Sequence, residues 1–144
     1  VEGYKNEKQV STPIVRNGNV IFTTVIPETN PCSGGGRSWV MELSVLSGKR
    51  LDVAPFDING DGKFDDADLI PVTDANGDTV YIPPSALASE DGMGILQSPG
   101  VVDGDSPSGP VQYKYSPGSS GSIQRITENP GAGTTGRQSW RQIR

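Results

Sequence analysis

Oxygen-bearing side chains recur at a fixed spacing between residues 57 and 68. Numbered as a twelve-residue loop, the segment has Asp or Asn at positions 1, 3, 5, 9 and 12 and a glycine, Gly62, at position 6. EF-hand-type calcium loops have this spacing, because short alternating side chains direct successive oxygens to one point and the glycine permits a sharp turn. The sequence therefore predicts a Ca²⁺ site formed by Asp57, Asn59, Asp61, Lys63 (through its carbonyl), Asp65 and Asp68.

Four of these ligands are aspartates in a single loop. Their mutual repulsion should penalise the folded loop unless a cation is present. Position 12 is Asp68 rather than the usual bidentate glutamate, which makes Mg²⁺ a stronger competitor for the site. An ordinary surface turn is the alternative interpretation, since Asp, Asn and Gly are also the commonest turn formers. The full spacing with its glycine favours calcium.

The flanks of the loop differ from those of an EF-hand. Pro55 precedes the loop, and Pro71 limits any exiting helix to about one turn. We therefore expect a calcium loop without flanking helices, and no switch by helix opening. A second acidic segment, residues 74–78, lacks the glycine and the position-12 acid, so it is predicted to be a hairpin turn rather than a second ion site.

Composition restricts the class of protein. The 144 residues suffice for one modest domain, and 19 glycines with 12 prolines favour turn-rich all-β structure. Because the chain has no histidine, Ser-His-Asp triads, Cys-His dyads and histidine-ligated zinc are excluded. The lone cysteine, Cys32, cannot close an intramolecular disulfide. With no constellation of base, nucleophile and cofactor ligands, we expect that the chain is not an enzyme.

Charge is unevenly distributed along the chain. The formal net charge is -5, but residues 52–105 carry -11 and the two flanks are mildly basic. Such an acidic block disfavours nucleic acid and favours a metal ion or a basic partner. No apolar run is long enough to predict a transmembrane segment. The start at Val1, without methionine, predicts either a piece of a longer precursor or a mature protein after signal removal.

The first third of the chain is predicted to form four short strands. Asn17-Gly18 suits a two-residue turn between strands 10–16 and 19–26. A third strand, residues 39–45, would place Trp39, Met41, Leu43 and Val45 on one face, and residues 51–53 would form a fourth strand. Four strands joined by tight turns are typical of one blade of a β-propeller.

Further strands are predicted between polar turns. The candidates are residues 79–82, 95–96 with 101–102, 111–115, 122–127 and 137–143, whereas 103–110 and 128–136 have the composition of loops. We expect Trp39 and Trp140 to pack in the core. The basic end is interpreted as a solvated strand edge, or as a contact with the acidic middle, and consists of Arg137, Arg141 and Arg144.

Five segments together resemble the C-terminal region of PilY/PilC-type type IV pilus biogenesis proteins. These segments are residues 13–24, Asn30-Pro31-Cys32, residues 39–43, the start of the calcium loop at 56–62 and Gly-Arg-Gln-Ser-Trp-Arg-Gln at 136–142. The resemblance implies a modified β-propeller with an exposed calcium site, in an extracellular or pilus-tip protein. It further implies that calcium occupancy supports pilus extension over retraction and surface attachment. Implied partners are minor pilins, the pilus tip and the remainder of the precursor, while contacts with host or abiotic surfaces would belong to an N-terminal region outside this sequence.

The expected organisation is a single propeller-type segment, residues 1–144. Blade-like strands occupy 1–54, the calcium loop 55–71, and further strands with Gly/Pro-rich loops 72–144. A propeller needs at least four blades, so this segment would have to complete its sheets with other chain or pack differently. The alternative is a dockerin-like calcium-dependent attachment module. Dockerins carry two loops with a helix each, and a single loop among strands argues against that assignment.

Overall fold

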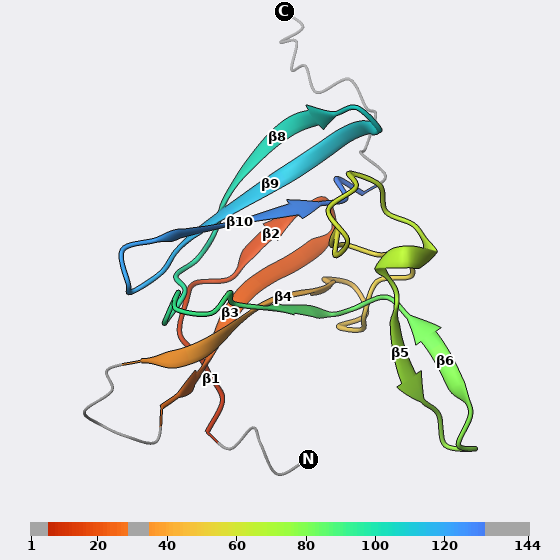
Figure 1. Cartoon of the computed structure of the whole chain (residues 1–144), viewed down its shortest axis with the longest axis horizontal. Coiled ribbons are helices and arrows are strands. Elements are labelled where there is room, and N and C mark those ends of the chain that lie inside the picture. Colours follow the sequence, from red (N-terminus) through yellow and green to blue (C-terminus); the bar gives the residue numbers. More distant parts are fainter. Residues whose placement is uncertain (1–5, 29–34, 132–144) are drawn as a thin grey trace, which may run out of the picture.

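The computed structural model describes residues 6–28 and 35–131, and in these ranges the chain is all-β (Figure 1). No α-helix occurs there, and one 3₁₀ turn, η1 (Asp66–Asp68), is present. The strands are β1 (Lys8–Gln9), β2 (Ile14–Arg16), β3 (Asn19–Pro27), β4 (Gly36–Ser44), β5 (Ile70–Thr73), β6 (Thr79–Ile82), β7 (Ala86–Ala88), β8 (Gly100–Ser106), β9 (Gly109–Pro117) and β10 (Ile123–Glu128).

The largest sheet has the strand order β1-β3-β4-β7, with β2 also paired to β3. The predicted β2–β3 hairpin is confirmed: Asn17 and Gly18 have φ angles of 50° and 82°, as a tight turn with two positive φ values requires. The third predicted strand is confirmed as β4, which pairs with β3 from Asn19↔Ser44 to Pro27↔Gly36. This long antiparallel pair is the framework of the sheet.

The predicted fourth strand at residues 51–53 is wrong. Those residues form no strand, and β7 pairs with β4 instead, from Met41↔Ala86 to Trp39↔Ala88. The chain after β4 is drawn away because Phe56 is buried in the core and bridges Glu128 at the end of β10. The blade expected from residues 10–53 is therefore not formed as predicted.

A second sheet has the order β10-β9-β8. It confirms strands at 101–102, 111–115 and 122–127, whereas in the 95–96 pair only Leu96 makes an isolated bridge, to Gly118. Residues 103–110, predicted to be a loop, instead continue β8 and begin β9 as a hairpin. Gly104 in β8 leaves room for the Tyr113 ring of β9. A Cβ at position 104 would lie only 2.6 Å from a carbon of that ring.

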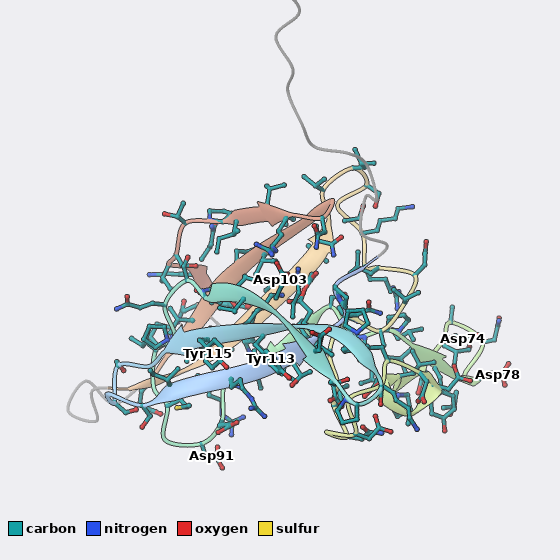
Figure 2. All side chains as sticks on the ribbon, turned by 90° about the horizontal axis from the view of Figure 1, so that it is seen from above. Asp74, Asp78, Asp91, Asp103, Tyr113 and Tyr115 are labelled. Atoms are coloured by element: carbon teal, nitrogen blue, oxygen red, sulfur yellow. The ribbon has the colours of Figure 1, made fainter. Side chains whose placement is uncertain are left out.

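A third unit, the β5–β6 hairpin, projects from the body of the molecule (Figure 1). Its turn carries Asp74 and Asp78, which Figure 2 shows at the tip. Asp74 Oδ1 accepts hydrogen bonds from the backbone of Asn76 and Asp78 at 2.8 and 2.9 Å, and Gly77 has φ 91°. The predicted hairpin turn is confirmed. The described strands thus form three separate antiparallel sheets, with no closed propeller or barrel among them.

The core lies between the first two sheets. Its buried cluster draws on β3, β4, β10 and the connecting segments, and consists of Ile21, Val40, Phe56, Met93, Leu96 and Ile126. In β4 the fully buried face carries Ser38, Val40 and Glu42, while Trp39 and Met41 are only half-buried on the opposite face. The expectation that Trp39 packs in the core is wrong. The face of β4 that carries Ser38, Val40 and Glu42 points into the core instead.

An ion pair also joins the two sheets at their edges. Arg16 in β2 donates from Nη2 to both carboxylate oxygens of Asp103 in β8, at 2.7 and 2.6 Å. The Arg16 hydrogen bonds hold the pKa of Asp103 below its usual value. Since the Asp103 side chain is 71% exposed, this contact contributes orientation more than stability.

Several predictions concern residues outside the described ranges. They are the state of Cys32, the Asn30-Pro31-Cys32 and 136–142 motifs, the strand at 137–143, the packing of Trp140 and the role of Arg137, Arg141 and Arg144. Within the predicted loop 128–136, Glu128 ends β10 and residues 129–131 form no strand. No helix in the described part of the chain is long and apolar enough to cross a membrane.

Candidate metal site

The candidate calcium loop, residues 57–68, begins at the edge of the second sheet. The Asp57 backbone N–H donates to the Thr127 carbonyl at 3.1 Å, and the Asn129 N–H donates to the Pro55 carbonyl at 2.9 Å. Residues 55–57 are therefore an extra strand-like segment along β10. Because Phe56, the residue before Asp57, is fully buried, the first loop position is fixed to the core.

The first half of the loop is organised by its own side chains. Asp57 accepts the Gly60 N–H at Oδ1 (2.7 Å) and the Gly62 N–H at Oδ2 (2.9 Å). Asn59 and Asp61 each accept a hydrogen bond from the N–H two residues further along the chain, at 2.9 and 2.8 Å. Gly60 and Gly62 have φ angles of 78° and 75°, which residues other than glycine rarely adopt. These side-chain-to-backbone hydrogen bonds are those of an Asx-rich turn, the alternative interpretation of the segment.

The second half of the loop is closed by Asp65 and Asp68. Asp65 caps η1 by accepting the Ala67 N–H at 2.9 Å, and Asp68 Oδ2 accepts the Asp65 N–H at 3.2 Å. Asp68 Oδ1 accepts the Ile58 N–H at 2.7 Å, and its side chain is fully buried. Asp68 therefore joins the end of the loop to its beginning. The expected absence of a long exiting helix agrees with η1, which leads directly into β5.

The loop also packs against the β8–β9 hairpin. Ser106 Oγ donates to the Gly62 carbonyl at 3.3 Å, and a Cβ added to Gly62 would lie 3.3 Å from the same oxygen. The glycine at position 6 thus serves both the turn and the contact with the second sheet. The loop is consequently held at its beginning by β10 and near its middle by β8.

The six predicted ligands share this loop and differ in burial. Asn59, Asp61, Lys63 and Asp65 are exposed, Asp57 is half-buried and Asp68 is buried. In residues 6–28 and 35–131, no three Asp, Glu, Cys or His side chains are close enough to form a metal cluster. The donor chemistry fits a hard cation, because all six donors are oxygens. In this arrangement, however, the side-chain oxygens hydrogen-bond the backbone of the loop.

Two curated relatives are distantly similar to this chain. Both are described as type IV pilus biogenesis factor PilY1 of Pseudomonas aeruginosa, from strains PAO1 and PAK, and each is 27% identical to it over 142 residues. The alignment covers 96% of this chain and 10% of the relative, so the chain spans about a tenth of the length of the curated relatives it matches. No family model and no solved structure matches. The distant similarity supports the family resemblance expected from the motifs.

A buried ionic cluster lies behind the loop. Lys114 in β9 is fully buried, and its Nζ donates to Glu42 Oε2 and Glu128 Oε1, each at 2.5 Å. Asn19 Nδ2 donates to the other oxygen of Glu42 at 2.7 Å. The Phe56 ring centroid lies 5.5 Å from Nζ, within the range of a cation–π contact. The cluster thus connects β3, β4, β9 and β10 across the sandwich.

The cluster holds a carboxyl with a strongly altered proton affinity. Burial, followed by hydrogen bonding to the neighbouring Glu42 carboxyl, raises the pKa of Glu128 from 4.5 to about 9. In the described part of the chain no donor reaches Glu128 Oε2, so a proton on that oxygen is consistent with its surroundings. With Glu128 protonated, one ammonium faces one carboxylate, and the buried cluster carries no net charge.

The sequence analysis did not identify this cluster. Lys114 lies in a strand where Gln112, Lys114 and Ser116 alternate with Tyr113 and Tyr115, and such a polar face is ordinarily the solvated one. In the structure Gln112, Lys114 and Ser116 are buried. The sequence showed only that Lys114, Glu42 and Glu128 lie in strand-like segments. That information does not indicate that the three side chains meet.

Proposed function

We propose that this chain is a calcium-binding β-domain of a type IV pilus biogenesis protein, located extracellularly at the pilus tip or outer cell surface. The observation that carries the proposal is the similarity to PilY1, which extends over 96% of the chain. It supports a role in type IV pilus biogenesis. The proposal further includes that calcium occupies the loop and that this occupancy supports pilus extension over retraction and surface attachment.

The loop supports the calcium part through its chemistry and position. Calcium would be held by oxygens of Asp57, Asn59, Asp61, Asp65 and Asp68 with the Lys63 carbonyl, and its charge would offset the repulsion among the aspartates. Asp57 and Gly62 are tied to β10 and β8 respectively, so neutralising the loop stabilises its attachment to the second sheet. The ion therefore acts on local order rather than by moving helices.

The proposed partners are minor pilins, other pilus-tip components and the remainder of a longer chain. The sheet arrangement supports this, because the β5–β6 hairpin pairs with no third strand among the described residues. A two-stranded ribbon is marginally stable in water, so further strands would stabilise it. Strands from the remainder of a longer chain would complete these small sheets and give the modified propeller. We propose a structural and regulatory role without catalysis.

The dockerin-like alternative has less support. It requires a second calcium loop and flanking helices, whereas residues 74–78 form a hairpin turn and the described ranges contain no α-helix. No observation in the fold favours it over the pilus proposal.

Calorimetric titration with Ca²⁺ tests the metal part of the proposal. We expect one ion per chain for the wild type and loss of binding in the Asp57→Asn, Asp61→Asn double variant. The matched control is Asp74→Asn, Asp78→Asn, which removes the same charge from the other acidic turn and should leave binding intact. Absence of heat up to about 10 mM Ca²⁺, or binding that survives the loop substitutions, would contradict the site.

The pilus part is tested in cells that make the full-length protein. The loop double variant should lower the number of surface pili relative to the turn double variant. If both strains extend and retract pili like the wild type, the regulatory role is wrong even where calcium binding is confirmed.

A further inference from the structure

The buried cluster between the two sheets brings together an amine, a carboxylate and a primary amide. Lys114 Nζ donates to Glu42 Oε2 at 2.5 Å, and Asn19 Nδ2 donates to Glu42 Oε1 at 2.7 Å. One carboxylate therefore lies between the two nitrogens and contacts each of them through a different oxygen. A nucleophilic amine, an acyl acceptor and a proton carrier are the three groups that formation of an amide bond requires.

The surroundings of the cluster exclude water. The Lys114 side chain is fully buried and that of Glu42 is 2% exposed, while the Phe56 ring centroid lies 5.5 Å from Nζ. An environment of this kind favours the neutral forms of an amine and a carboxyl group over the ion pair, compared with water. Transfer of a proton from Lys114 to Glu42 frees the lone pair of Nζ and leaves no charge to solvate.

The chemistry of the neighbouring groups selects the acyl acceptor. Lys114 Nζ also contacts Glu128 Oε1, at 2.5 Å. An amine does not attack a carboxylate, and it takes the proton of a carboxylic acid in preference to forming a bond with its carbon. The half-buried Asn19 carries a neutral primary amide, which keeps its protons and releases its nitrogen as ammonia. Asn19 is therefore the acyl acceptor of this cluster.

We propose that Lys114 and Asn19 form an intramolecular amide bond, with Glu42 as the proton carrier. Nζ attacks Cγ of Asn19, so that the Nζ–Cγ bond forms and the Cγ–Nδ2 bond breaks. Of the three ammonium hydrogens, one stays on Nζ, one passes through Glu42 to Nδ2, and one remains on Glu42. Ammonia leaves, the buried site carries no net charge, and the reaction consumes no oxidant or cofactor.

The bond would join the two sheets covalently. Asn19 is the first residue of β3 in the first sheet, and Lys114 lies in β9 in the second. A cross-link between positions so distant in sequence restricts the unfolded chain and prevents the two sheets from separating fully. Because the reaction removes the charge of Lys114, the salt-bridged cluster is the state before bond formation. This inference goes beyond the proposed function and requires neither calcium nor a pilus.

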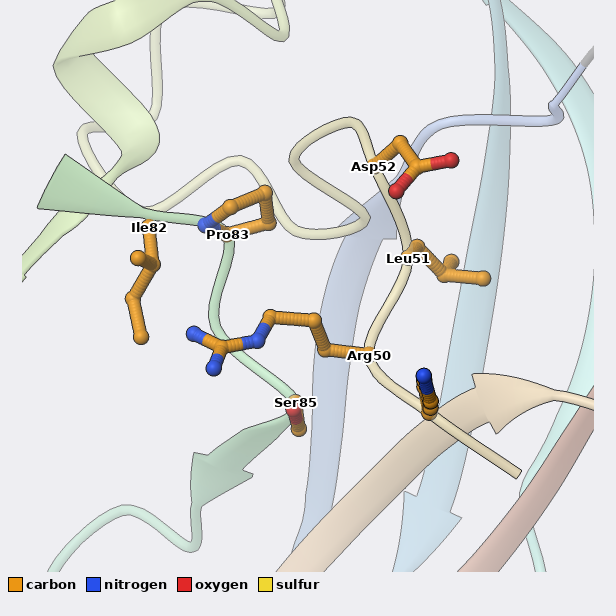
Figure 3. Close-up of a pocket in the computed structure, with 7 residues that line it drawn as sticks. Arg50, Leu51, Asp52, Ile82, Pro83 and Ser85 are labelled. Atoms are coloured by element: carbon orange, nitrogen blue, oxygen red, sulfur yellow. The ribbon is translucent and has the colours of Figure 1, made fainter. Parts of the chain in front are cut away.

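Lys49 provides a contrast to Lys114. It is exposed, and it lines an open cleft of about 750 Å³ whose lining contains no side-chain amide (Figure 3). The other residues that line this cleft are Arg50, Leu51, Asp52, Ile82, Pro83 and Ser85. The Lys49 amine is thus solvated and has no acyl acceptor in the cleft, so Lys49 serves as the control lysine.

The test is mass spectrometry of the purified full chain. After prolonged incubation of the folded protein, we expect an intact mass lower than that of the sequence by one ammonia. Trypsin does not cleave after an acylated lysine, so the digest should contain residues 17–37 joined to residues 64–125. Cyclisation at Asn17-Gly18 to a succinimide also releases ammonia, but it leaves those two peptides separate.

Substitutions assign the roles of the three groups. Lys114→Arg keeps the positive charge without the amine, Asn19→Ala removes the acyl acceptor, and Glu42→Gln removes the proton carrier. Each should abolish the linked peptide. The matched controls are Lys49→Arg and Asn17→Gly, which remove an exposed amine and the other amide of the β2–β3 turn, and both should retain the link. Circular dichroism verifies that each variant is folded, and the wild-type result does not depend on any variant.

Three outcomes would overturn the proposal. The first is a wild-type mass equal to that of the sequence, which would show that no bond forms. The second is loss of water with Lys114 joined to a peptide that contains Glu42 or Glu128, which would make a glutamate the acyl acceptor. The third is an undiminished link in Glu42→Gln, which would show that Glu42 does not carry the proton.

Discussion

The Lys114 ammonium lies 5.5 Å from the centroid of the Phe56 ring, and Phe56 immediately precedes Asp57, the first position of the candidate calcium loop. One buried side chain thus connects the loop to the ionic cluster between the sheets. The Phe56 backbone also forms a β-bridge with Glu128. Phe56 therefore contacts both Lys114 and Glu128 of the cluster. The loop and the core are therefore mechanically linked rather than separate features.

Replacing Phe56 by alanine should destabilise the whole domain. The side chain is fully buried, so Phe56→Ala should lower the free energy of unfolding by about 3–5 kcal/mol. Urea denaturation followed by circular dichroism measures it. Tyr81→Ala, in the exposed β5–β6 hairpin, is the aromatic control and should change stability by less than about 0.5 kcal/mol. Equal effects of the two substitutions would mean that Phe56 does not link the loop to the core.

Removal of Lys114 should be costly, because it leaves two buried carboxyls without their cation. Lys114→Met should lower the free energy of unfolding by about 3–5 kcal/mol. Replacing Glu42 and Glu128 by leucine in the same chain should restore most of that loss, since an apolar cluster of similar volume requires no charge compensation. Exposed Lys8→Met, outside the candidate loop, is the control, with an expected change below about 0.5 kcal/mol. If the triple variant is no more stable than Lys114→Met, the cluster does not act as a unit.

Local turn chemistry was predictable from the sequence. Asn17-Gly18 and the Asp74–Asp78 turn formed as expected, because positive φ angles and Asx hydrogen bonds are decided within a few residues. The side-chain-to-backbone hydrogen bonds of loop 57–68 match the alternative interpretation of that segment, an Asx-rich surface turn. Convergence of the loop oxygens on a metal involves the ion itself, and it stays a prediction.

Long-range pairing was less predictable. Residues 51–53 and 86–88 compete for the edge of β4, and nothing local in either segment decides which one pairs. The outcome depends on burial of Phe56 against β10, an interaction across more than half the described chain. The inner face of β4 was mistaken for the outer one because burial of Glu42 depends on Lys114, which lies 72 residues away. Polar residues enter a core only with partners that a single sequence does not identify.

Stability should fall as the pH rises from about 4.5 to about 9 through the contribution of Glu128. Its pKa is raised from 4.5 to about 9, mainly by burial, so in this window the native state retains a proton that the unfolded chain releases. The stabilisation is fully present below the unfolded pKa and is lost as the pH rises towards the folded one, with a slope of at most about 1.4 kcal/mol per pH unit.

The variant Glu128→Gln isolates this contribution. It keeps an uncharged polar group in place of the protonated carboxyl, so the difference in unfolding free energy between wild type and variant should change with pH in that direction. Other carboxyls, such as Asp103 with its lowered pKa, act with the opposite sign but are present in both proteins. Chemical denaturation at pH 5, 7 and 9 gives the difference. A pH-independent difference would show that Glu128 is ionised in the folded protein.

Gly62→Ala should destabilise the loop more than Gly60→Ala. Both glycines have positive φ, near 75° and 78°, so each substitution should cost roughly 1 kcal/mol of backbone strain. At Gly62 the new Cβ also meets Ser106 Oγ at 3.3 Å, while at Gly60 nothing lies within 4 Å. Thermal unfolding of the two variants compares them directly. If their melting temperatures are equal, the contact between the loop and β8 does not constrain the loop.

Calcium removal should loosen the domain in a defined order. Without the ion, repulsion among the four loop aspartates weakens the hydrogen bonds that fold residues 57–68, and the strain reaches the attachment of residues 55–57 to β10. Hydrogen exchange with and without chelator should show protection lost across residues 52–82 and at Asn129, whose N–H donates to Pro55. Residues 10–26 should keep their protection, because β3 pairs with β4 along its full length and with β2 through a tight turn.

The Asp57→Asn, Asp61→Asn variant is the control, since it should not respond to chelator at all. Loss of protection throughout the chain would mean that calcium maintains the entire fold, and an unchanged pattern would mean that the ion does not order the loop.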